Sequence, residues 1–364
     1  MTSVHPHDDV RIFHRQAKSL RDAGYHVTVL CRDYEGEREG VLFHRIELPL
    51  ERSRRMRQVS KAFYRAALRQ HSDLYHIHDP ELLPAALKLQ KAGQKVIYDI
   101  HEDLPLQLLD KGWIPRPLRP MAAFCAGRWE EWSARRLSGC IAATGEIAQR
   151  MKKRRASVTL VRNYPEPREL ERPFIPFDRR PRRAVYVGGL TRNRGMLTMA
   201  EAMLHTDAQL VMAGPVENLN DFERLRRLAG IGRQVDYRGV LCREDVADLL
   251  GQSRVGLLLL HPTAAYQRAL PIKLFEYMLA GLPVVASDFP LWRELAGEEC
   301  AVYVNPLDAA AIAQTVGALI NDPQRAEAMG RAGRARALER YSFAAERESL
   351  IGCYNSLLLP EVQS

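Results

Sequence analysis

The residues best suited to chemistry lie between Leu270 and Pro290. Lys273 and Glu276 are three positions apart, so on a helix they share one face. The N-terminus of a helix has free N–H groups and a positive dipole end, which favour phosphate. A lysine there would add a cation for phosphate, and the glutamate could accept hydrogen bonds from sugar hydroxyls. The pair therefore suits a nucleotide-sugar, although a capped helix with an i,i+3 ion pair explains the same two residues.

The flanking residues predict the element that carries this pair. Pro271 suits the first turn of a helix, because its missing N–H would have no intrahelical partner there. Gly281 suits the position just past the helix end, and Pro283 prevents continuation. Residues 284–286 form a short apolar run that is typical of a buried parallel strand. We therefore expect a loop, a helix over about 271–279 and a strand.

A second basic position lies further back in the chain. Residues 184–190 predict a strand that ends in Gly188 and Gly189, where the missing side chains let a ligand approach the backbone. Arg194 then falls at a predicted helix N-terminus, where it could bind phosphate, and Arg192 is an alternative. The glycine spacing differs from the Gly-x-Gly-x-x-Gly dinucleotide fingerprint, which argues against a nicotinamide enzyme.

Polar residues also follow predicted strands in the first half of the chain. The strands over 73–78 and 95–100 end at His78-Asp79 and at His101, and open α/β sheets bind ligands at these ends. Thr144 and Glu146 follow a third strand and could cap a helix or line a site. The N-terminal loop holds polar residues that could likewise cap the helix predicted to end near residue 23, or bind an acceptor; they are His5, Asp8, Asp9 and Arg11.

A metal site is conceivable from His76, His78, His101 and nearby carboxylates. However, His76 and His78 share one face of a strand, without the helical or hairpin spacing that metal sites favour. We therefore predict no metal and no tightly bound cofactor.

The organisation of the chain follows from its length and pattern. At 364 residues it is too long for one ordinary core, and strand, loop and helix alternate through both halves, which indicates parallel sheets. We predict an α/β fold with two domains, over 1–167 and 168–340. The linker is proline-rich and continues through Arg182, and a C-terminal helix within 341–364 packs back on the first domain.

Composition narrows the class of protein. Hydrophobic residues make up 46% and charged residues 27% of the chain, as in soluble globular proteins. No apolar run is long enough to span a membrane, and the first residues do not resemble a signal peptide, so we expect a cytoplasmic protein. Six scattered cysteines without a Cys-x-x-Cys pair indicate buried, reduced thiols.

The net charge of +9 suggests an anionic partner. Basic residues cluster in two places: Arg52, Arg54, Arg55, Arg57, Lys61, Arg65 and Arg69, and then Arg150, Lys152, Lys153, Arg154 and Arg155. Apolar residues are interleaved with the first cluster, namely Met56, Val59, Phe63, Tyr64, Ala67 and Leu68. This pattern predicts either a basic amphipathic helix on an anionic membrane surface or a solvated helix face. No nucleic-acid motif accompanies the charge, so no nucleic-acid partner is expected.

The string from Pro271 to Ser287, Pro-x-Lys-x-Phe-Glu-Tyr-Met-x-Ala-Gly-x-Pro-Val-x-Ala-Ser, resembles the donor-binding motif of family 4 retaining glycosyltransferases. The resemblance implies the GT-B fold, in which two Rossmann-like domains face each other across a cleft. It implies that Glu276 bonds the donor ribose, that Arg194 and Lys273 neutralise the pyrophosphate, and that His101 contacts the transferred sugar. The other donor-binding positions it implies are Gly188, Gly189, Arg192, Arg238, Gly239, Val240, Pro271 and Leu274.

The same resemblance assigns the first half of the chain to the acceptor side. The implied acceptor or cleft residues are His5, Asp8, Asp9, Arg11, His78, Asp79, Thr144 and Glu146. Members of the family normally begin with a strand before the loop that holds His5. Almost none of it precedes that loop here, so we expect the first strand of the N-terminal domain to be missing.

One position departs from the family pattern. Eight residues before Glu276 the family usually has a second acidic residue that touches the donor sugar, and this chain has Arg268. Arginine cannot accept hydrogen bonds from sugar hydroxyls. Either the donor sugar is held differently, for example because it carries a negative charge, or the activity is altered or lost.

The resulting prediction is retaining, metal-independent transfer of a sugar from a UDP- or GDP-linked donor to an acceptor hydroxyl. The basic charge suggests a polysaccharide or polyprenyl-linked acceptor and a peripheral position at the inner membrane surface. The alternatives are a nucleotide-sugar epimerase or hydrolase on the same fold, and a catalytically silent binding partner of an active transferase.

Overall fold

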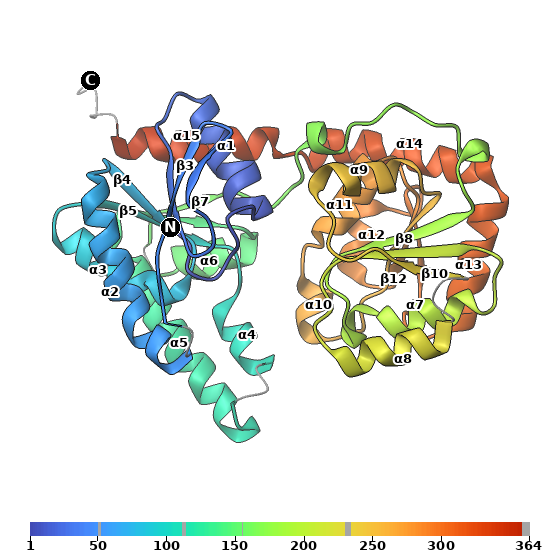
Figure 1. The fold of residues 1–364 in the computed structure, drawn as a ribbon, viewed down its shortest axis with the longest axis horizontal. Coiled ribbons are helices and arrows are strands. Elements are labelled where there is room, and N and C mark those ends of the chain that lie inside the picture. Colours follow the sequence, from blue (N-terminus) through green and yellow to red (C-terminus); the bar gives the residue numbers. More distant parts are fainter. Residues whose placement is uncertain (50–51, 111–113, 155, 230–233, 359–364) are drawn as a thin grey trace. The chain divides into compact units, whose positions relative to one another are not determined.

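The computed structural model describes the chain except residues 50–51, 111–113, 155, 230–233 and 359–364. At residues 52–57, 110, 228–229 and 264 it describes the backbone alone. The chain forms two compact units, Met1–Asn163 with Phe343–Ser364, and Tyr164–Ser342. Both are built from helices and strands in alternation (Figure 1).

The first unit holds two sheets, with strand orders β1-β3-β2 and β4-β5-β6-β7. The strands are β1 (Thr28–Cys31), β2 (Gly36–Arg38), β3 (Val41–Arg45), β4 (Leu74–Ile77), β5 (Lys95–Ile100), β6 (Gly139–Ala142) and β7 (Val158–Leu160). All pairs are parallel, as predicted, except β2 with β3. The antiparallel β2–β3 pair was not predicted.

The first residues of the chain connect these two sheets. The amide of Thr2 donates to the carbonyl of Leu30 at the end of β1 (2.9 Å). On the other side, the amino group of Met1 donates to the carbonyl of His76 (2.7 Å), and the amide of His78 donates to the carbonyl of Met1 (3.1 Å). Beyond this bridge, β1 and β4 line a cavity of about 450 Å³. Among the described residues, no strand pairs with both β1 and β4.

Helices cover these sheets, and the C-terminal helix is one of them. Their bounds are η1 (Val10–Ala17), α1 (Lys18–Asp22), α2 (Arg52–Gln70), η2 (Pro80–Leu82), α3 (Leu83–Lys91), α4 (Leu104–Asp110), η3 (Arg116–Leu118), α5 (Arg119–Ala134), α6 (Gly145–Lys152) and α15 (Phe343–Leu358). Phe343, Leu350 and Tyr354 of α15 pack with Ile141 and Val161. This packing confirms that the chain returns to the first unit.

Helix α2 corrects one prediction. Val59, Phe63 and Ala67 are completely or almost completely buried in the core of the first unit, while Lys61 and Arg65 are exposed. Val59, Phe63 and Ala67 therefore form the core-facing side of α2 and are not available to insert into a membrane, whereas Leu68 is exposed. The side chains of Arg52, Arg54, Arg55, Met56 and Arg57, like Arg155, lie outside the described part of the chain.

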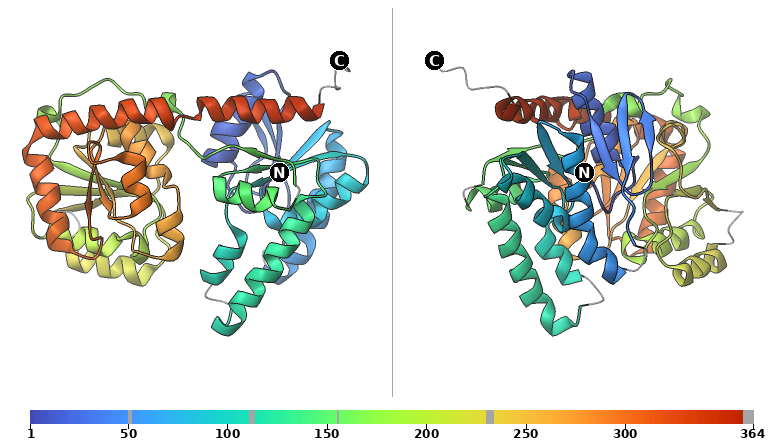
Figure 2. Two further views of the ribbon diagram at one scale, coloured as in Figure 1. Left: turned by 180° about the vertical axis from the view of Figure 1, so that it is seen from behind. Right: turned by 60° about the vertical axis from the view of Figure 1, so that its left-hand side comes forward.

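The second unit contains one parallel sheet of order β10-β9-β8-β11-β12-β13. Its strands are β8 (Arg183–Val187), β9 (Gln209–Ala213), β10 (Val235–Tyr237), β11 (Val255–Leu258), β12 (Val284–Ser287) and β13 (Ala301–Val304). Its helices are η4 (Pro167–Leu170), η5 (Phe177–Arg179), η6 (Arg192–Arg194), α7 (Met196–Met203), α8 (Leu219–Ala229), α9 (Arg243–Gly251), α10 (Ala264–Arg268), α11 (Ile272–Leu279), α12 (Pro290–Ala296), α13 (Ala309–Asn321) and α14 (Pro323–Arg340). Helices lie on both faces of the sheet (Figures 1 and 2), which makes it apolar on both sides.

The boundary between the units falls near the predicted one. Tyr164 packs edge-on against Phe275 and Tyr341, with ring centroids 5.2 and 5.5 Å apart. This aromatic cluster belongs to the core of the second unit. The second unit therefore begins at Tyr164 and ends at Ser342, a few residues from the predicted boundaries at 167 and 341.

A buried ion pair fixes η1 to the sheet of the first unit. Arg11 donates to both carboxylate oxygens of Asp99, at 2.8 and 2.7 Å, and to the carbonyl of Val161 at 3.0 Å. Gln16 donates to the same carboxylate at 2.8 Å. Burial opposes ionisation of Asp99, but the Arg11 guanidinium and the adjacent His78 hold the pKa of Asp99 well below its ordinary value. Arg11 is thus committed to the core, contrary to its predicted role at the acceptor.

We expect Arg11→Met to destabilise the protein by about 3 kcal/mol, because it leaves the Asp99 charge buried without its partner. The depressed pKa of Asp99 means that the pair stabilises the fold above the ordinary pKa of 3.8 and that this contribution is lost as the pH falls. Urea unfolding at pH 7 and pH 3 measures both effects. Arg65→Met, on the exposed face of α2, is the control and should change stability by less than about 0.5 kcal/mol. Equal effects of the two variants at pH 7 would contradict this account.

Candidate active site

Helix α11 places the predicted donor residues. It runs from Ile272 to Leu279, with Pro271 as its N-cap, one position before the predicted first turn. Gly281 has φ +70° and follows the C-cap, so the left-handed conformation that ends the helix falls on a glycine. Leu274 is completely buried against the core and fixes the rotation of the helix. The predicted succession of loop, helix and strand is confirmed.

Two cations meet the backbone where β8 ends. Gly188 has φ +143°, and a Cβ atom there would collide with the end of the Lys273 side chain. A Cβ atom at Gly189 would collide with the guanidinium of Arg194. Lys273 of α11 and Arg194 of η6 can therefore approach the backbone here only because both adjacent residues are glycines. The structure thus brings together Gly188, Gly189, Lys273 and Arg194, as predicted.

The electrostatics of this site favour an anion. Lys273 and Arg194 are both half-buried, and neither forms an ion pair with any residue that the structure describes. Burial and the nearby Arg194 charge lower the pKa of Lys273 to about 8. Burial lowers the pKa of Arg194, but Tyr266, Tyr186 and Glu217 raise it overall, so the cost of holding two cations together falls on Lys273, and a diphosphate would remove that cost.

Glu276 has a partner that the sequence did not indicate. It is buried, and its carboxylate accepts a hydrogen bond from Arg243 at the start of α9 (2.9 Å). Arg243 also donates to Glu169 (2.7 Å). One arginine between two carboxylates holds both side chains in place. The signal for Arg243 was absent from the sequence, because α9 is far from the donor motif along the chain.

The remaining predicted donor residues lie on the surface of the second unit. Arg192 pairs with Asp221 (2.8 Å) and Arg238 with Asp236 (2.9 Å), and both arginines are exposed. Gly239 has φ +69°, and its carbonyl accepts a hydrogen bond from the amide of Gly214 (2.7 Å). Val240 is 72% exposed, which leaves its side chain free to contact a ligand.

Arg268 ends helix α10 and is exposed. It forms no hydrogen bond or ion pair with any other residue in the described part of the chain. Its charge is therefore available to solvent or to a ligand.

The first unit gathers a separate polar cluster. His101, which follows β5, has its Nε2 atom 3.0 Å from Nε2 of His5. The ring of His5 also lies 3.4 Å from both Asp9 and Asp79. Burial lowers the pKa of His5, but the two carboxylates outweigh it and raise the value overall. One of these two nitrogens donates and the other accepts, according to the tautomers of the two rings.

Several predicted acceptor residues also have structural roles. The carboxylate of Asp9 caps η1 by accepting from the amides of Arg11 and Ile12 (2.9 Å each), and Thr144 caps α6. Asp79 accepts hydrogen bonds from Thr2 and Ser3 and so holds the N-terminal loop. The alternative of helix capping is thus confirmed for Asp9 and Thr144. Asp8 and Glu146 are exposed, whereas His78 is buried.

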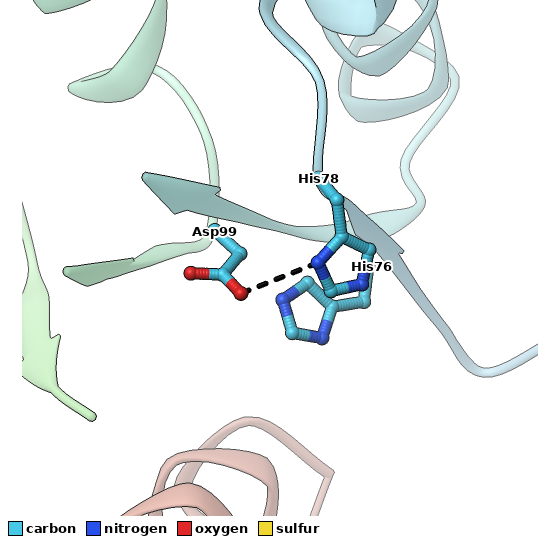
Figure 3. Close-up of side chains that lie close together, drawn as sticks. All are labelled: His76, His78 and Asp99. Carbon is cyan, nitrogen blue, oxygen red and sulfur yellow. Dashed lines mark ion pairs between the residues drawn. The ribbon is translucent and has the colours of Figure 1, made fainter. Parts of the chain in front are cut away.

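His76, His78 and Asp99 lie close enough together to suggest a metal site (Figure 3). However, Arg11 occupies both oxygens of Asp99, and its positive charge would repel a metal ion. His76 is hydrogen-bonded to the hydroxyl of Tyr354 (2.9 Å), and burial holds its pKa well below the ordinary value. These residues fit a hydrogen-bonded core cluster better than a metal site. Metal independence remains a prediction.

Comparison with known proteins agrees with this geometry. Residues 10–164 match the family described as "Glycosyl transferase 4-like domain", and residues 181–322 match "Glycosyl transferases group 1". Together the two matches cover most of the chain. The chain belongs to the glycosyltransferases of the family 4 type and has their GT-B fold.

Individual relatives and solved structures support the same assignment. The chain is 27% identical over 162 residues to MMP alpha-(1->4)-mannosyltransferase of Mycolicibacterium hassiacum, covering 44% of this chain and 38% of the relative. It is 29% identical over 161 residues to D-rhamnosyltransferase WbpZ of Pseudomonas aeruginosa, covering 43% and 40%. The chain thus spans less than half the length of these curated relatives.

Among solved structures, sucrose-phosphate synthase of Thermosynechococcus elongatus superposes with a TM-score of 0.77 at 18% identity, over 98% of this chain and 94% of that one. Anabaena Alr3699/HepE in complex with UDP-glucose superposes with a TM-score of 0.72 at 12% identity, over 98% of both chains.

In the part of the chain that the structure describes, none of the helices combines the length and the hydropathy that a membrane span needs.

The lowered pKa of Lys273 predicts a pH-dependent affinity for nucleoside diphosphates. Above pH 8 the free protein has a neutral Lys273, so binding an anion there requires proton uptake. We expect the Kd for the diphosphate to rise about tenfold per pH unit above this pKa. Calorimetry in buffers of different ionisation enthalpy measures both the Kd and the protons taken up. Lys273→Gln should abolish the proton uptake, whereas Arg192→Gln should retain it. Uptake that persists in Lys273→Gln would contradict the assignment.

Proposed function

We propose that the protein is a retaining glycosyltransferase that moves a sugar from a UDP- or GDP-linked donor to an acceptor hydroxyl. The observation that carries the proposal is the convergence of Lys273 and Arg194 on the Gly188–Gly189 turn. Breaking the anomeric C–O bond leaves negative charge on the diphosphate. Two preorganised cations stabilise that charge in the transition state more than in the ground state.

The donor nucleotide would bind to the second unit. In this proposal Glu276 accepts hydrogen bonds from the ribose hydroxyls, and Arg243 keeps the carboxylate ionised and oriented. The strand end at Gly239 and Val240 would meet the base. Titles of solved structural relatives record complexes with UDP and with UDP-glucose, which supports a nucleotide-sugar as the donor.

The first unit would bind the acceptor side of the reaction. His101 would hold the transferred sugar, and the neighbouring His5, Asp9 and Asp79 would fix its imidazole. The two carboxylates of the cluster are engaged in structural hydrogen bonds, Asp9 with the amides of Arg11 and Ile12 and Asp79 with Thr2 and Ser3, which fits same-face attack of the acceptor without a covalent enzyme intermediate. Metal independence follows from the use of Lys273 and Arg194 in place of a divalent cation.

The acceptor in this proposal is a polysaccharide or polyprenyl-linked sugar at the inner membrane surface, reached by a cytoplasmic protein. The net charge of +9 supports a surface that carries anionic lipid. Proton NMR of the reaction with an α-linked donor tests the stereochemistry, because a retaining enzyme yields the α-product. A β-product, or activity lost in EDTA and restored by a divalent metal ion, would contradict the mechanism.

Glu276→Gln tests the ribose contact. We expect the variant to bind the nucleoside diphosphate about 10- to 100-fold more weakly, because it loses charge-assisted hydrogen bonds to the ribose. A 2′-deoxyribose analogue should bind the wild type more weakly than the parent diphosphate but should bind the variant about equally. Calorimetry with the four combinations isolates the contact. If the losses in binding free energy from Glu276→Gln and from removal of the 2′-hydroxyl were additive, the ribose would not contact Glu276.

Arg268 favours an anionic donor sugar within the same function, because its exposed guanidinium has no partner among the described residues. A uronic acid donor would supply the carboxylate that it can bind. Arg268→Glu should then lower kcat/KM for a uronic acid donor at least about tenfold and leave UDP or GDP affinity unchanged.

If the wild type turns over no donor but binds the nucleotide, the catalytically silent alternative replaces the proposal. Release of free or epimerised sugar without an acceptor would favour a hydrolase or epimerase.

A further inference from the structure

Helix α5 buries small residues and exposes large apolar ones, which is the reverse of the usual arrangement. Its inward side carries small residues, and Ala123, Gly127 and Ala134 are buried. A Cβ atom at Gly127 would lie only 2.9 Å from the ring of Pro105, so α5 packs closely on α4 there. The large apolar residues of this region face outward instead.

The outward side forms a patch that we call the α4–α5 apolar patch. Its members are Leu109, Leu118, Met121, Phe124, Trp129 and Trp132. Phe124 is 69% exposed and Met121 62%. Within α5, Met121 with Phe124 and Trp129 with Trp132 are pairs three residues apart, so each pair shares one side of the helix. The other exposed large apolar residues of the described chain belong to other elements and loops of the two units. A cluster of this kind on a soluble domain marks an interaction surface.

The N-terminal end of α5, which starts at Arg119, projects beyond the sheet of the first unit in both Figure 1 and Figure 2. Its other end is anchored. The hydroxyl of Tyr98 donates to the buried carboxylate of Glu130 (2.8 Å), and Arg150 of α6 donates to the same carboxylate (2.9 Å). The patch is therefore presented on a rigid support.

The charges around the patch are basic. Arg116 and Arg135 are exposed and pair with no described residue. The guanidinium of Arg136 lies 3.8 Å from the ring centre of Trp132. The acidic residue on this side, Glu131, is neutralised by Arg128 (3.2 Å) and Arg154 (2.9 Å). Through that last contact, the second basic cluster found in the sequence lies beside α5.

The two tryptophans combine an apolar surface with a free donor. Their rings stack with centroids 5.2 Å apart, and no described residue accepts a hydrogen bond from either indole N–H. Tryptophan with such a free donor is typical of the boundary between acyl chains and headgroups. Arginine beside it can bury its methylene groups and keep its charge in the headgroup layer.

We propose that the α4–α5 apolar patch docks the protein on a bilayer that contains anionic phospholipid. Met121 and Phe124 insert among the acyl chains, Trp129 and Trp132 lie at the headgroup level, and the arginines contact phosphates. This inference deepens the proposed function, on which it rests for the location of the acceptor at a membrane. It replaces α2, whose apolar side is buried, as the membrane-contacting element.

Vesicle sedimentation tests the docking without requiring transfer. The wild type should bind vesicles with about one third phosphatidylglycerol and bind pure phosphatidylcholine at least about tenfold more weakly. Met121→Ser/Phe124→Ser should weaken binding to the anionic vesicles at least about tenfold. Phe174→Ser is the matched control, since Phe174 is 63% exposed in the second unit, and it should bind like the wild type.

Two double variants, each of which removes two positive charges, locate the electrostatic contact. Arg116→Gln/Arg135→Gln should weaken binding at least about fivefold, an effect that salt reduces. Lys61→Gln/Arg65→Gln, on the exposed side of α2, should have a smaller effect. Circular dichroism and UDP or GDP affinity confirm that each variant is folded.

Cys125 offers a spectroscopic readout, since it is exposed on α5 while Cys31, Cys140, Cys300 and Cys353 are buried. In a Cys242→Ser background, an environment-sensitive fluorophore on Cys125 should shift to the blue on anionic vesicles.

Three results would overturn the inference: absence of vesicle binding, binding that the Met121/Phe124 variant does not weaken, or a dimer that this variant converts to monomer, which would assign the patch to a second copy of the chain. If vesicles bind but no nucleotide does, the proposed function fails while the docking stands. If the nucleotide binds but vesicles do not, the docking inference fails while the transferase proposal stands.

Discussion

The close approach of two cations at the end of β8 is the constraint on which the site depends. Lys273 and Arg194 reach the same pair of glycines, and their mutual repulsion contributes to the lowered pKa of Lys273. Such an arrangement stores electrostatic cost in the free protein. An anionic ligand releases that cost, and a leaving group that gains negative charge during the reaction releases more of it. The α11 helix, its proline N-cap and its buried Leu274 keep Lys273 in this position.

The first unit solves the opposite problem, since it buries the Asp99 carboxylate with Arg11 on both of its oxygens. Asp99 lies at the centre of a network with Arg11, Gln16 and His78, which joins η1 to the strand ends. His5 and His101 meet beside this network, and they retain partly open surroundings. The Arg11–Asp99 pair thus supports the cluster that we assign to the acceptor side.

The sequence was informative wherever a local signal determined the structure. Glycine and proline residues at the element ends placed α11 and β12 within a residue or two, and the apolar runs placed β4, β5 and β8. It failed where tertiary contacts decide. The charge of Arg11 gave no sign that it would be buried against Asp99, eighty-eight positions away, and Arg243 is brought to Glu276 only by the fold. The amphipathic pattern of α2 was real, but a helix that covers a core has the same pattern as one that lies on a membrane. Conversely, α5 has no simple amphipathic pattern, because small residues face inward and large ones outward.

The central claim is that Lys273 and Arg194 bind the β-phosphate end of a donor diphosphate. Its most direct test is a comparison of mono- and diphosphates by calorimetry, with UDP against UMP and GDP against GMP. We predict that one diphosphate binds at least about tenfold more tightly than its monophosphate, and that Lys273→Gln removes most of this difference while leaving monophosphate affinity unchanged. Equal affinities of the wild type for UDP and UMP, and for GDP and GMP, would contradict the claim.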